Sequence, residues 1–245
     1  MKSGKKNNPD ESATRNIFFR RVINRLEDAP SCKYSTATKN NIKKMNSLID
    51  DTSLLLLVGG GVGSHGNHIN LLRQHVLQNA VNIEIVLGPN VDIVADGHQL
   101  PFGDYSFDCI ICQAVLEHTR DSQKVVKEIY RVLKRDGIVY AEIPFLQPVH
   151  MSSDYRRYSL MGIDELFASF TKLQSGVNGA VASSFALIAV EFFATLFSFK
   201  IRKLYCIFLL LLPWLFFPVK YLDVLFCNYE SNNIAAAGCY FLGKK

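Results

Sequence analysis

A cluster of glycines between residues 59 and 66 is the clearest chemical signal in the sequence. It reads Gly-Gly-Gly-Val-Gly-Ser-His-Gly and directly follows an apolar run. Glycines at such a turn let the backbone approach a ligand closely, and a helix that starts there offers free N–H groups to polar or anionic atoms. Gly61, Gly63 and Gly66 match the G-x-G-x-x-G spacing, and Glu84 stands where an acid binds a ribose. These residues leave open a nicotinamide enzyme, an enzyme with another nucleoside cofactor, and a glycine-rich turn without a ligand.

A second polar cluster lies in the segment 144–159, beyond an expected strand. Ligands of open α/β sheets bind outside the carboxyl ends of parallel strands. His150 in this segment and His118 before it are candidate bases, because histidine titrates near neutrality. Asp154 could orient one of these histidines, or it could form an ion pair that only holds the loop together.

The elements around these residues are expected to alternate between strand and helix. Residues 119–133 place Val125, Ile129 and Val132 on one face, which predicts an amphipathic helix. Apolar runs predict strands over 53–58, 83–87, 91–95, 107–112, 138–143 and 235–242. Such alternation predicts an α/β fold with a parallel sheet and helices on both faces.

Two cysteines with CxxC spacing fall inside one of these strands. Cys109 and Cys112 would point to opposite faces of the sheet, so they could not share a metal ion. No metal site is therefore expected.

Residues 180–227 carry much of the apolar excess that gives the chain a mean hydropathy of +0.10. They contain the only Trp and nine of the 17 Phe. Two apolar stretches, 185–199 and 204–219, are separated by basic residues. As helices they would be roughly 22–24 Å long, short of the ~30 Å hydrocarbon core of a bilayer.

Pro213 and Pro218 are also expected to interrupt the second apolar stretch. A spanning hairpin would place its basic turn outside, against the positive-inside tendency. The sequence therefore favours a re-entrant or interfacial hairpin, with Trp214 at the membrane boundary. Packing of these helices on the body or on a dimer partner is the alternative.

Charge is distributed as unevenly as hydropathy. Residues 1–44 hold eleven Lys or Arg and four acids, a balance of +7, so the remaining 201 residues carry −2 of the total +5. A nucleic-acid-binding domain carries its basic surface on the fold itself, so no nucleic-acid partner is expected. The tail could contact anionic lipid headgroups or remain solvated. The scattered cysteines and the charged, polar start of the chain favour a cytosolic, reduced protein.

Several motifs follow the glycine loop in a fixed order. They are Asp96 after the third strand, Leu100-Pro101-Phe102, Ser106-Phe107-Asp108, Leu116-Glu117-His118 and Arg131-Val132-Leu133 before a glycine. Over residues 54–170 this order resembles class I S-adenosylmethionine-dependent methyltransferases of the small-molecule branch. The loop 144–159 is similar to one in bacterial methyltransferases linked to surface-glycan pathways. The resemblance implies a Rossmann-like fold with a mostly parallel seven-stranded sheet and, here, an apolar helical insertion before the last strand.

The resemblance also implies S-adenosylmethionine as the cofactor and assigns residues to it. The glycines would surround its amino-acid part, Glu84 would accept the ribose hydroxyls, and Asp96 would hold the adenine amino group. The implied cofactor-binding residues are Gly59, Gly60, Gly61, Gly63, Glu84, Asp96, Gly97, His98 and Gln113. The implied catalytic residues are His150, His118 and Asp154, and the acceptor-binding residues are Glu117, Tyr155 and Arg156.

Two positions depart from the family pattern. Leu57 replaces the acid that usually stands two residues before the first loop glycine, and Glu84 lies within an apolar run rather than after it. A non-catalytic relative that keeps the fold is therefore an alternative, as is an NAD(P)-dependent oxidoreductase that uses the same glycine loop.

The sequence as a whole predicts a membrane-associated methyltransferase. The expected acceptor is a small molecule, a glycan or a lipid-linked molecule, met at the cytoplasmic face of a membrane through residues 180–227, and homo-oligomerisation is left open. The expected parts are 1–52 (basic tail and N-terminal helices), 53–178 (core), 179–228 (apolar hairpin) and 229–245 (last strand and C-terminus).

Overall fold

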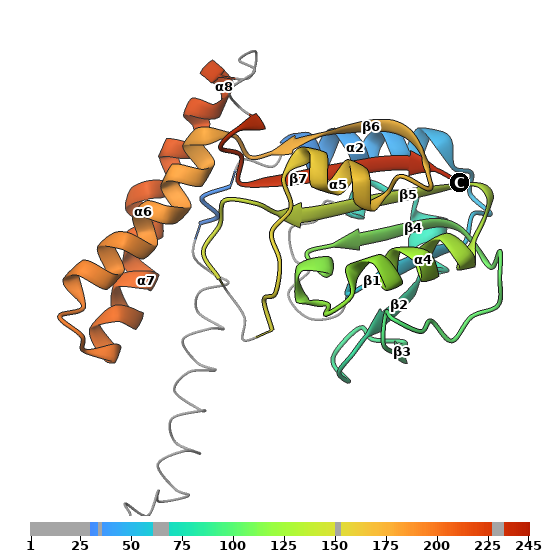
Figure 1. The fold of residues 1–245 in the computed structure, drawn as a ribbon, viewed down its shortest axis with the longest axis horizontal. Coiled ribbons are helices and arrows are strands. Elements are labelled where there is room, and N and C mark those ends of the chain that lie inside the picture. The colour runs from blue at the N-terminus through green and yellow to red at the C-terminus, as the bar shows by residue number, and fades with distance from the viewer. Residues whose placement is uncertain (1–29, 34–35, 61–68, 150–152, 227–232) are drawn as a thin grey trace, which may run out of the picture.

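A seven-stranded sheet forms the centre of the computed structural model, which describes residues 30–33, 36–60, 69–149, 153–226 and 233–245 (Figure 1). The strand order is β3-β2-β1-β4-β5-β7-β6. Strands β1 to β5 are parallel, and β7 runs antiparallel to both β5 and β6. Their bounds are β1 Leu55–Val58, β2 Val81–Glu84, β3 Ile93–Val94, β4 Phe107–Gln113, β5 Leu133–Pro144, β6 Thr171–Asn178 and β7 Gly238–Lys244. The predicted mostly parallel, Rossmann-like sheet is confirmed.

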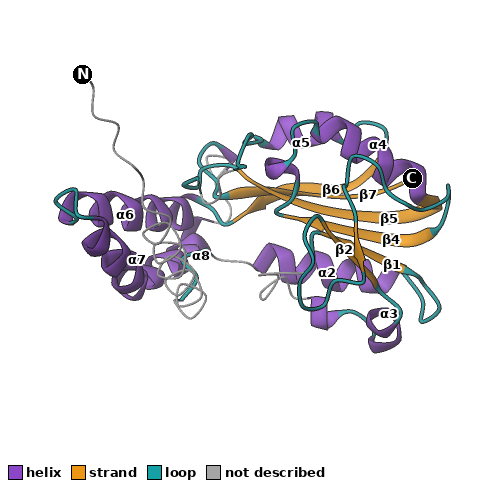
Figure 2. Ribbon diagram, turned by 90° about the horizontal axis from the view of Figure 1, so that it is seen from below, coloured by secondary structure: helices purple, strands orange, loops and turns teal. Residues whose placement is uncertain are grey.

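Helices cover both faces of this sheet, as the sequence predicts (Figure 2). Helices α4 (Ser122–Val132) and α5 (Leu160–Leu166) pack on one face, and α2 (Thr36–Leu48) and α3 (Gln74–Gln78) pack on the other. Successive strand residues alternate between the faces. Cys112 accordingly lies in the core under α4 and Cys109 in the core under α2. Burial raises the pKa of Cys109 to about 12, so this thiol stays protonated.

The edge of the sheet near β3 differs from the prediction. Strand β2 ends at Glu84, and the apolar residues 85–87 that follow are exposed rather than paired. Strand β3 has only two residues, paired with Ile83 and Glu84. Strand β3 lies at the edge of the sheet and has only one neighbouring strand, so its apolar residues remain exposed. An apolar run in the sequence is therefore a weak guide to the length of the strands here.

Helix α4 also begins later than predicted. It starts at Ser122 instead of residue 119, because the Asp121 side chain caps it by accepting the N–H of Lys124 at 3.0 Å. His118 lies before it, in a short 3₁₀ helix, Leu116–His118. Ser159 caps α5 by accepting the N–H of Gly162.

A helical hairpin projects from the end of the sheet toward which the arrowheads of β4 and β5 point (Figure 1). It consists of α6 (Val181–Phe197), α7 (Arg202–Phe216), a 3₁₀ helix (Phe217–Leu222) and α8 (Asp223–Phe226). Small side chains let the two long helices approach each other, since Ala186, Val190 and Ala194 are buried together with Leu212.

The expected interruption of the second apolar stretch at Pro213 is wrong. Pro213 lies inside α7, where it removes one backbone hydrogen bond, and packing against α6 compensates, with Phe193 stacked on Phe216 at 5.5 Å. The helical run Arg202–Leu225 has 24 residues and contains an 18-residue window with a mean hydropathy of 1.8. Among the described residues it is the one helix long and apolar enough to cross a membrane.

A buried carboxylate joins the two ends of the hairpin. Asp223, at the start of α8, accepts the N–H of Ala180 at 2.9 Å, the N–H of Ala182 at 2.8 Å and the hydroxyl of Ser183 at 2.6 Å. These groups belong to the first turn of α6, where backbone N–H groups lack partners within the helix. No local sequence pattern indicates this contact, because the residues are about 40 positions apart.

Candidate active site

The two described loop glycines lie where β1 ends, beside the end of β2. The N–H of Gly59 donates to the carbonyl of Ile83 at 2.9 Å. Gly59 has a φ of +73°, and a Cβ atom there would lie 2.2 Å from a methyl group of Val115. A Cβ on Gly60 would lie 2.7 Å from Oδ1 of Asn82. Neither position accepts a side chain, as expected where a backbone must approach a ligand. Gly61 and Gly63 lie outside the described residues.

Gln113, the last residue of β4, has an unsatisfied amide. The side chain is buried, and neither its nitrogen nor its oxygen has a hydrogen-bond partner among the described residues. It lines a small cleft with Leu57, Val58, Gly59, Gly60, Ile69 and Ile111. Buried polar groups are almost always paired, so an unpaired amide beside the glycines indicates a place for a polar ligand group. This is where the resemblance places the methionine part of the cofactor.

Leu57 is buried and faces the core under α2, so it offers no charge to a ligand ammonium. The amide oxygen of Gln113 and the backbone carbonyls of the same cleft are the acceptors available in its place.

Two acids stand at the ends of the next two strands. Glu84 closes β2, one residue after Ile83, whose carbonyl accepts the Gly59 N–H, and Ala95 donates to the Glu84 carbonyl at 2.9 Å. Asp96 follows β3 and accepts the N–H of His98 at 2.9 Å and the N–H of the His98 ring nitrogen Nδ1 at 2.6 Å. These two bonds lower the pKa of Asp96. The roles of Glu84 and Asp96 as ribose and adenine contacts stay predictions.

The His98 ring is held in one orientation. Its Nε2 accepts the N–H of Asp121 at 3.3 Å, so Nδ1 carries the proton that Asp96 accepts. Gly97, between Asp96 and His98, packs against Val125 of α4, where a Cβ would lie 3.4 Å from a methyl group.

A second unsatisfied polar group follows β4. The Glu117 side chain is fully buried, and neither carboxylate oxygen has a hydrogen-bond partner among the described residues. Nε2 of His118 lies 3.7 Å from Oε1, and Nδ1 of His118 donates to the carbonyl of Ser153 at 3.0 Å. Burial raises the pKa of Glu117, with the negative charge of Asp154 adding to the effect. Glu117 and His118 together can accept and hold a proton.

The polar loop packs on this pair without presenting all its side chains to it. Asp154 is fully buried and forms a bidentate ion pair with Arg157, and the N–H of Tyr155 donates to the Glu117 carbonyl at 2.8 Å. Arg156 donates to the carbonyl of Arg120 at 2.6 Å. The structure thus assigns Asp154 an arginine partner that the sequence reasoning named only in general terms. The roles of these residues stay predictions, and His150 lies outside the described residues.

A cavity of about 520 Å³ opens in front of Glu117, between the strand ends and the hairpin. We refer to it as the edge cavity. It is lined by Pro30, Ser31, Cys32, Lys33, Ala114, Glu117, Glu142, Ile143, Pro144, Gln147, Pro148, Leu187, Val190, Glu191, Leu209 and Pro213. Strand ends, helix α6 and helix α7 therefore share one cavity.

Sequence reasoning missed Glu142, which reaches this cavity from β5. The carboxylate accepts the hydroxyl of Thr38 at 2.6 Å and that of Tyr140, and Lys33 Nζ lies 3.9 Å away. The signal was present in the sequence, since Glu142 is the one charged residue in an otherwise apolar strand end, Tyr-Ala-Glu-Ile-Pro.

The strand order, the glycine turn and the acids after β2 and β3 are features by which the chain resembles methyltransferases that use S-adenosylmethionine. Residues 58–141 match the family described as "Methyltransferase domain".

Known proteins with similar sequences match about a third of the chain. The C-methyltransferase UbiE of ubiquinone and menaquinone biosynthesis from Klebsiella pneumoniae is 36% identical over 92 residues, 36% of each chain. The mitochondrial arginine-hydroxylase NDUFAF5 of Rattus norvegicus is 31% identical over 98 residues, 36% of this chain and 28% of the relative. The chain thus spans about a third of these relatives.

Solved structures extend the similarity of the fold to most of the chain. A putative sarcosine dimethylglycine methyltransferase from Galdieria sulphuraria aligns with a TM-score of 0.51 and 15% identity, covering 82% of each chain.

Proposed function

We propose that the protein transfers a methyl group from S-adenosylmethionine to an acceptor bound in the edge cavity. The observation that carries this proposal is the unpaired, buried amide of Gln113 beside the Gly59–Gly60 turn. A ligand with an ammonium and a carboxylate, such as the methionine part of the cofactor, would satisfy both atoms of that amide. The ordered acids Glu84 and Asp96 support the same placement for the nucleoside part.

When bound, S-adenosylmethionine supplies an electrophilic methyl group on a sulfonium. The chain itself must then position the acceptor and, for a hydroxyl or amine, remove a proton. Glu117 and His118 support that step, since the buried carboxylate lines the edge cavity and its neighbour 3.7 Å away can share the proton. Asp154 and Arg157 hold the loop on which this arrangement depends.

Thermal shift with S-adenosylhomocysteine, NADH and NADPH tests the cofactor. We expect S-adenosylhomocysteine at saturating concentration to raise the melting temperature by several degrees, because a ligand that binds only the folded state stabilises it. NADH and NADPH should leave the melting temperature unchanged. Stabilisation by NAD(P)H alone would overturn the proposal in favour of an oxidoreductase, and binding of neither would favour a non-catalytic relative.

We further propose that the hairpin rests on the cytoplasmic face of a membrane. Its apolar side chains are more than half exposed at Phe185, Phe192, Leu211, Trp214 and Leu215, among others. Several exposed, large apolar side chains on neighbouring helices are typical of membrane or protein contact sites. The two helices end in a turn with Lys200, Arg202 and Lys203, which suits anionic headgroups.

Vesicle flotation tests this placement. The full chain should float with vesicles of phosphatidylethanolamine and phosphatidylglycerol. Replacing Leu211, Trp214 and Leu215 together by Gln should weaken binding roughly a hundredfold, at a few kcal/mol of lost apolar burial. Met161→Gln is a matched control, because Met161 is 84% exposed on α5 of the body. Equal binding by the triple variant and the control would remove the membrane from the proposal.

A further inference from the structure

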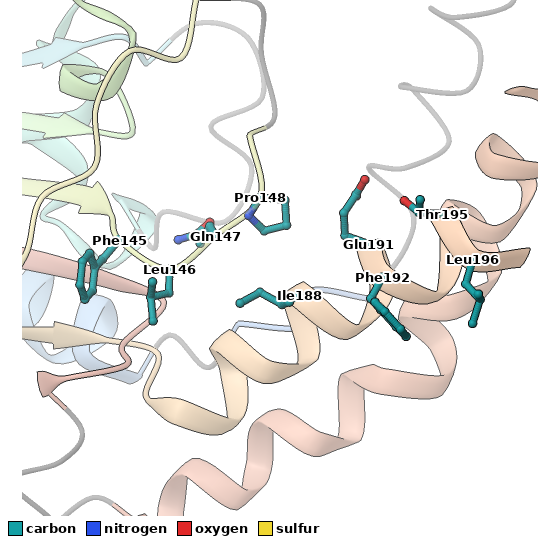
Figure 3. Close-up of a pocket in the computed structure, with 9 residues that line it drawn as sticks. All are labelled: Phe145, Leu146, Gln147, Pro148, Ile188, Glu191, Phe192, Thr195 and Leu196. Carbon is teal, nitrogen blue, oxygen red and sulfur yellow. The ribbon is translucent and has the colours of Figure 1, made fainter. Parts of the chain in front are cut away.

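A second cavity lies beside the edge cavity, along one face of α6. It has a volume of about 570 Å³ and is lined by Phe145, Leu146, Gln147, Pro148, Ile188, Glu191, Phe192, Thr195 and Leu196. We call it the α6 groove. Figure 3 shows the loop residues 145–148 on one side of it and the side chains of α6 on the other, with Ile188 extending toward the loop.

The walls of the groove are apolar and uncovered. Ile188, Phe192 and Leu196 are 47%, 58% and 53% exposed. They recur every four residues, so they form one continuous stripe along α6. This stripe is separate from the face that contacts α7, which carries Ala186, Val190 and Ala194.

The groove and the edge cavity adjoin each other, because Gln147, Pro148 and Glu191 line both. The edge cavity is also lined by Glu117, whose buried oxygens lack hydrogen-bond partners among the described residues. An apolar groove that adjoins a cavity with a buried carboxylate, next to the proposed methyl-transfer site, has the layout of a binding site for a molecule with two unlike ends.

The polar end favours one charge type. Three carboxylates line the edge cavity, Glu117, Glu142 and Glu191, against one cation, Lys33. Oxygen-rich walls accept hydrogen bonds and repel anions. The head of the ligand should therefore donate hydrogen bonds through hydroxyl or amine groups and carry no negative charge.

From this adjacency we infer that the acceptor is an amphipathic, single-chain molecule: its apolar tail lies in the α6 groove and its uncharged or cationic, hydrogen-bond-donating head lies at Glu117. This inference rests on the proposed methyltransferase function and adds the chemical class of the acceptor. The exposed hairpin surface supports a tail that reaches the site from a lipid phase, along α6.

A series of alkylglycerols tests the tail. The full chain, saturated with S-adenosylhomocysteine, is titrated by calorimetry with 1-alkylglycerols of about four to ten carbons, each below its micelle concentration; affinity should rise roughly twofold to fourfold per methylene. Ile188→Gln and Phe192→Gln should each weaken the ten-carbon probe about tenfold and the four-carbon probe hardly at all. Leu225→Gln is the matched control, an exposed leucine on α8 that does not line the groove. Equal losses in control and groove variants would show surface partition and overturn the inference, as would affinity independent of chain length.

Decanoate tests the head. With its tail matched to the longest alkylglycerols and a negative head, it should bind at least tenfold more weakly than the uncharged probe, and tighter binding would overturn the inference about charge. Binding of S-adenosylhomocysteine in the same samples separates the two proposals: cofactor binding without chain-length dependence removes only the amphipathic acceptor, whereas absent cofactor binding removes the methyltransferase itself.

Discussion

The sheet body and the helical hairpin leave opposite kinds of groups without partners. In the body, apolar side chains are buried on both faces of the sheet, and the buried polar groups without a hydrogen-bond partner among the described residues include Gln113 at the end of β4 and Glu117 shortly after it. In the hairpin, the carboxylates of Asp223 and Glu191 accept hydrogen bonds, and the exposed side chains include large apolar ones such as Trp214 and Leu215. These groups indicate a polar ligand for the body and an apolar partner for the hairpin.

The largest expected effect tests the polar side of this comparison. Glu117→Gln keeps the shape of the side chain and removes its capacity to take a proton, so methyl transfer should fall by about 10²–10⁴. Labelled methyl transfer from S-adenosylmethionine into an extract of cells that lack the protein measures it. Affinity for S-adenosylhomocysteine should remain within twofold of wild type; an unchanged transfer rate would remove Glu117 from the chemistry.

The next effect tests whether the hairpin is held as a separate unit. Asp223→Ala leaves the first turn of α6 without its acceptor, which should cost about 2–3 kcal/mol at the hairpin base. Hydrogen exchange should accelerate at Ala182 and Ser183 before it changes in the strands. The affinity for S-adenosylhomocysteine serves as the control, and a large change in it would mean that body and hairpin are coupled.

A smaller effect on cofactor binding is expected from the side-chain amide of Gln113. Gln113→Ala should weaken S-adenosylhomocysteine binding about tenfold, the value of one hydrogen bond to a charged group. Gln113→Glu restores a carboxylate near the cleft that Leu57 leaves uncharged, and should bind as tightly as wild type or more tightly. Calorimetry gives both constants, and equal weakening by the two variants would indicate a packing role instead.

The smallest effect is a pH-dependent gain in stability. Burial raises the folded-state pKa of Glu117, so ionisation costs stability, and stability is lost as pH rises through that folded-state pKa. Gln does not ionise, so Glu117→Gln should melt about 2–4 °C above wild type near pH 8, for roughly 1 kcal/mol, and no higher near pH 4. A gain of the same size at both pH values would mean that the charge is not its source.

Features of the fold that depend on neighbouring residues could be predicted from the sequence, whereas features that depend on distant residues could not. Strands β1 and β4 and residues 138–143 of β5 followed from unbroken apolar runs, because these signals lie within a few residues. The end of β2 at Glu84 instead of residue 87 depends on pairing with a two-residue edge strand, and local hydropathy does not encode it.

The site divides in the same way. Glu117, Gln113 and the strand-end acids could be named from motif order. Three features depend on residues 40 or more positions apart, so only the folded chain brings them together. They are the cavity between α6 and residues 145–148, the contacts of Glu142, and the hydrogen bonds of Asp223 to the first turn of α6. Pro213 inside α7 belongs to this group, since tertiary packing outweighed the local preference of proline.

One feature of the sheet bears on how such a protein could arise. The chain leaves β6 at Asn178 and re-enters β7 at Gly238, and these two residues are paired; beside them Ala237 donates to the carbonyl of Gly179 at 2.7 Å. The intervening segment therefore starts and ends at one point, where a tight turn would join the same two strands. A hairpin attached at one point could be gained, lost or exchanged during evolution while the sheet and its proposed cofactor site stay unaltered. Such an exchange would change which acceptor the protein binds.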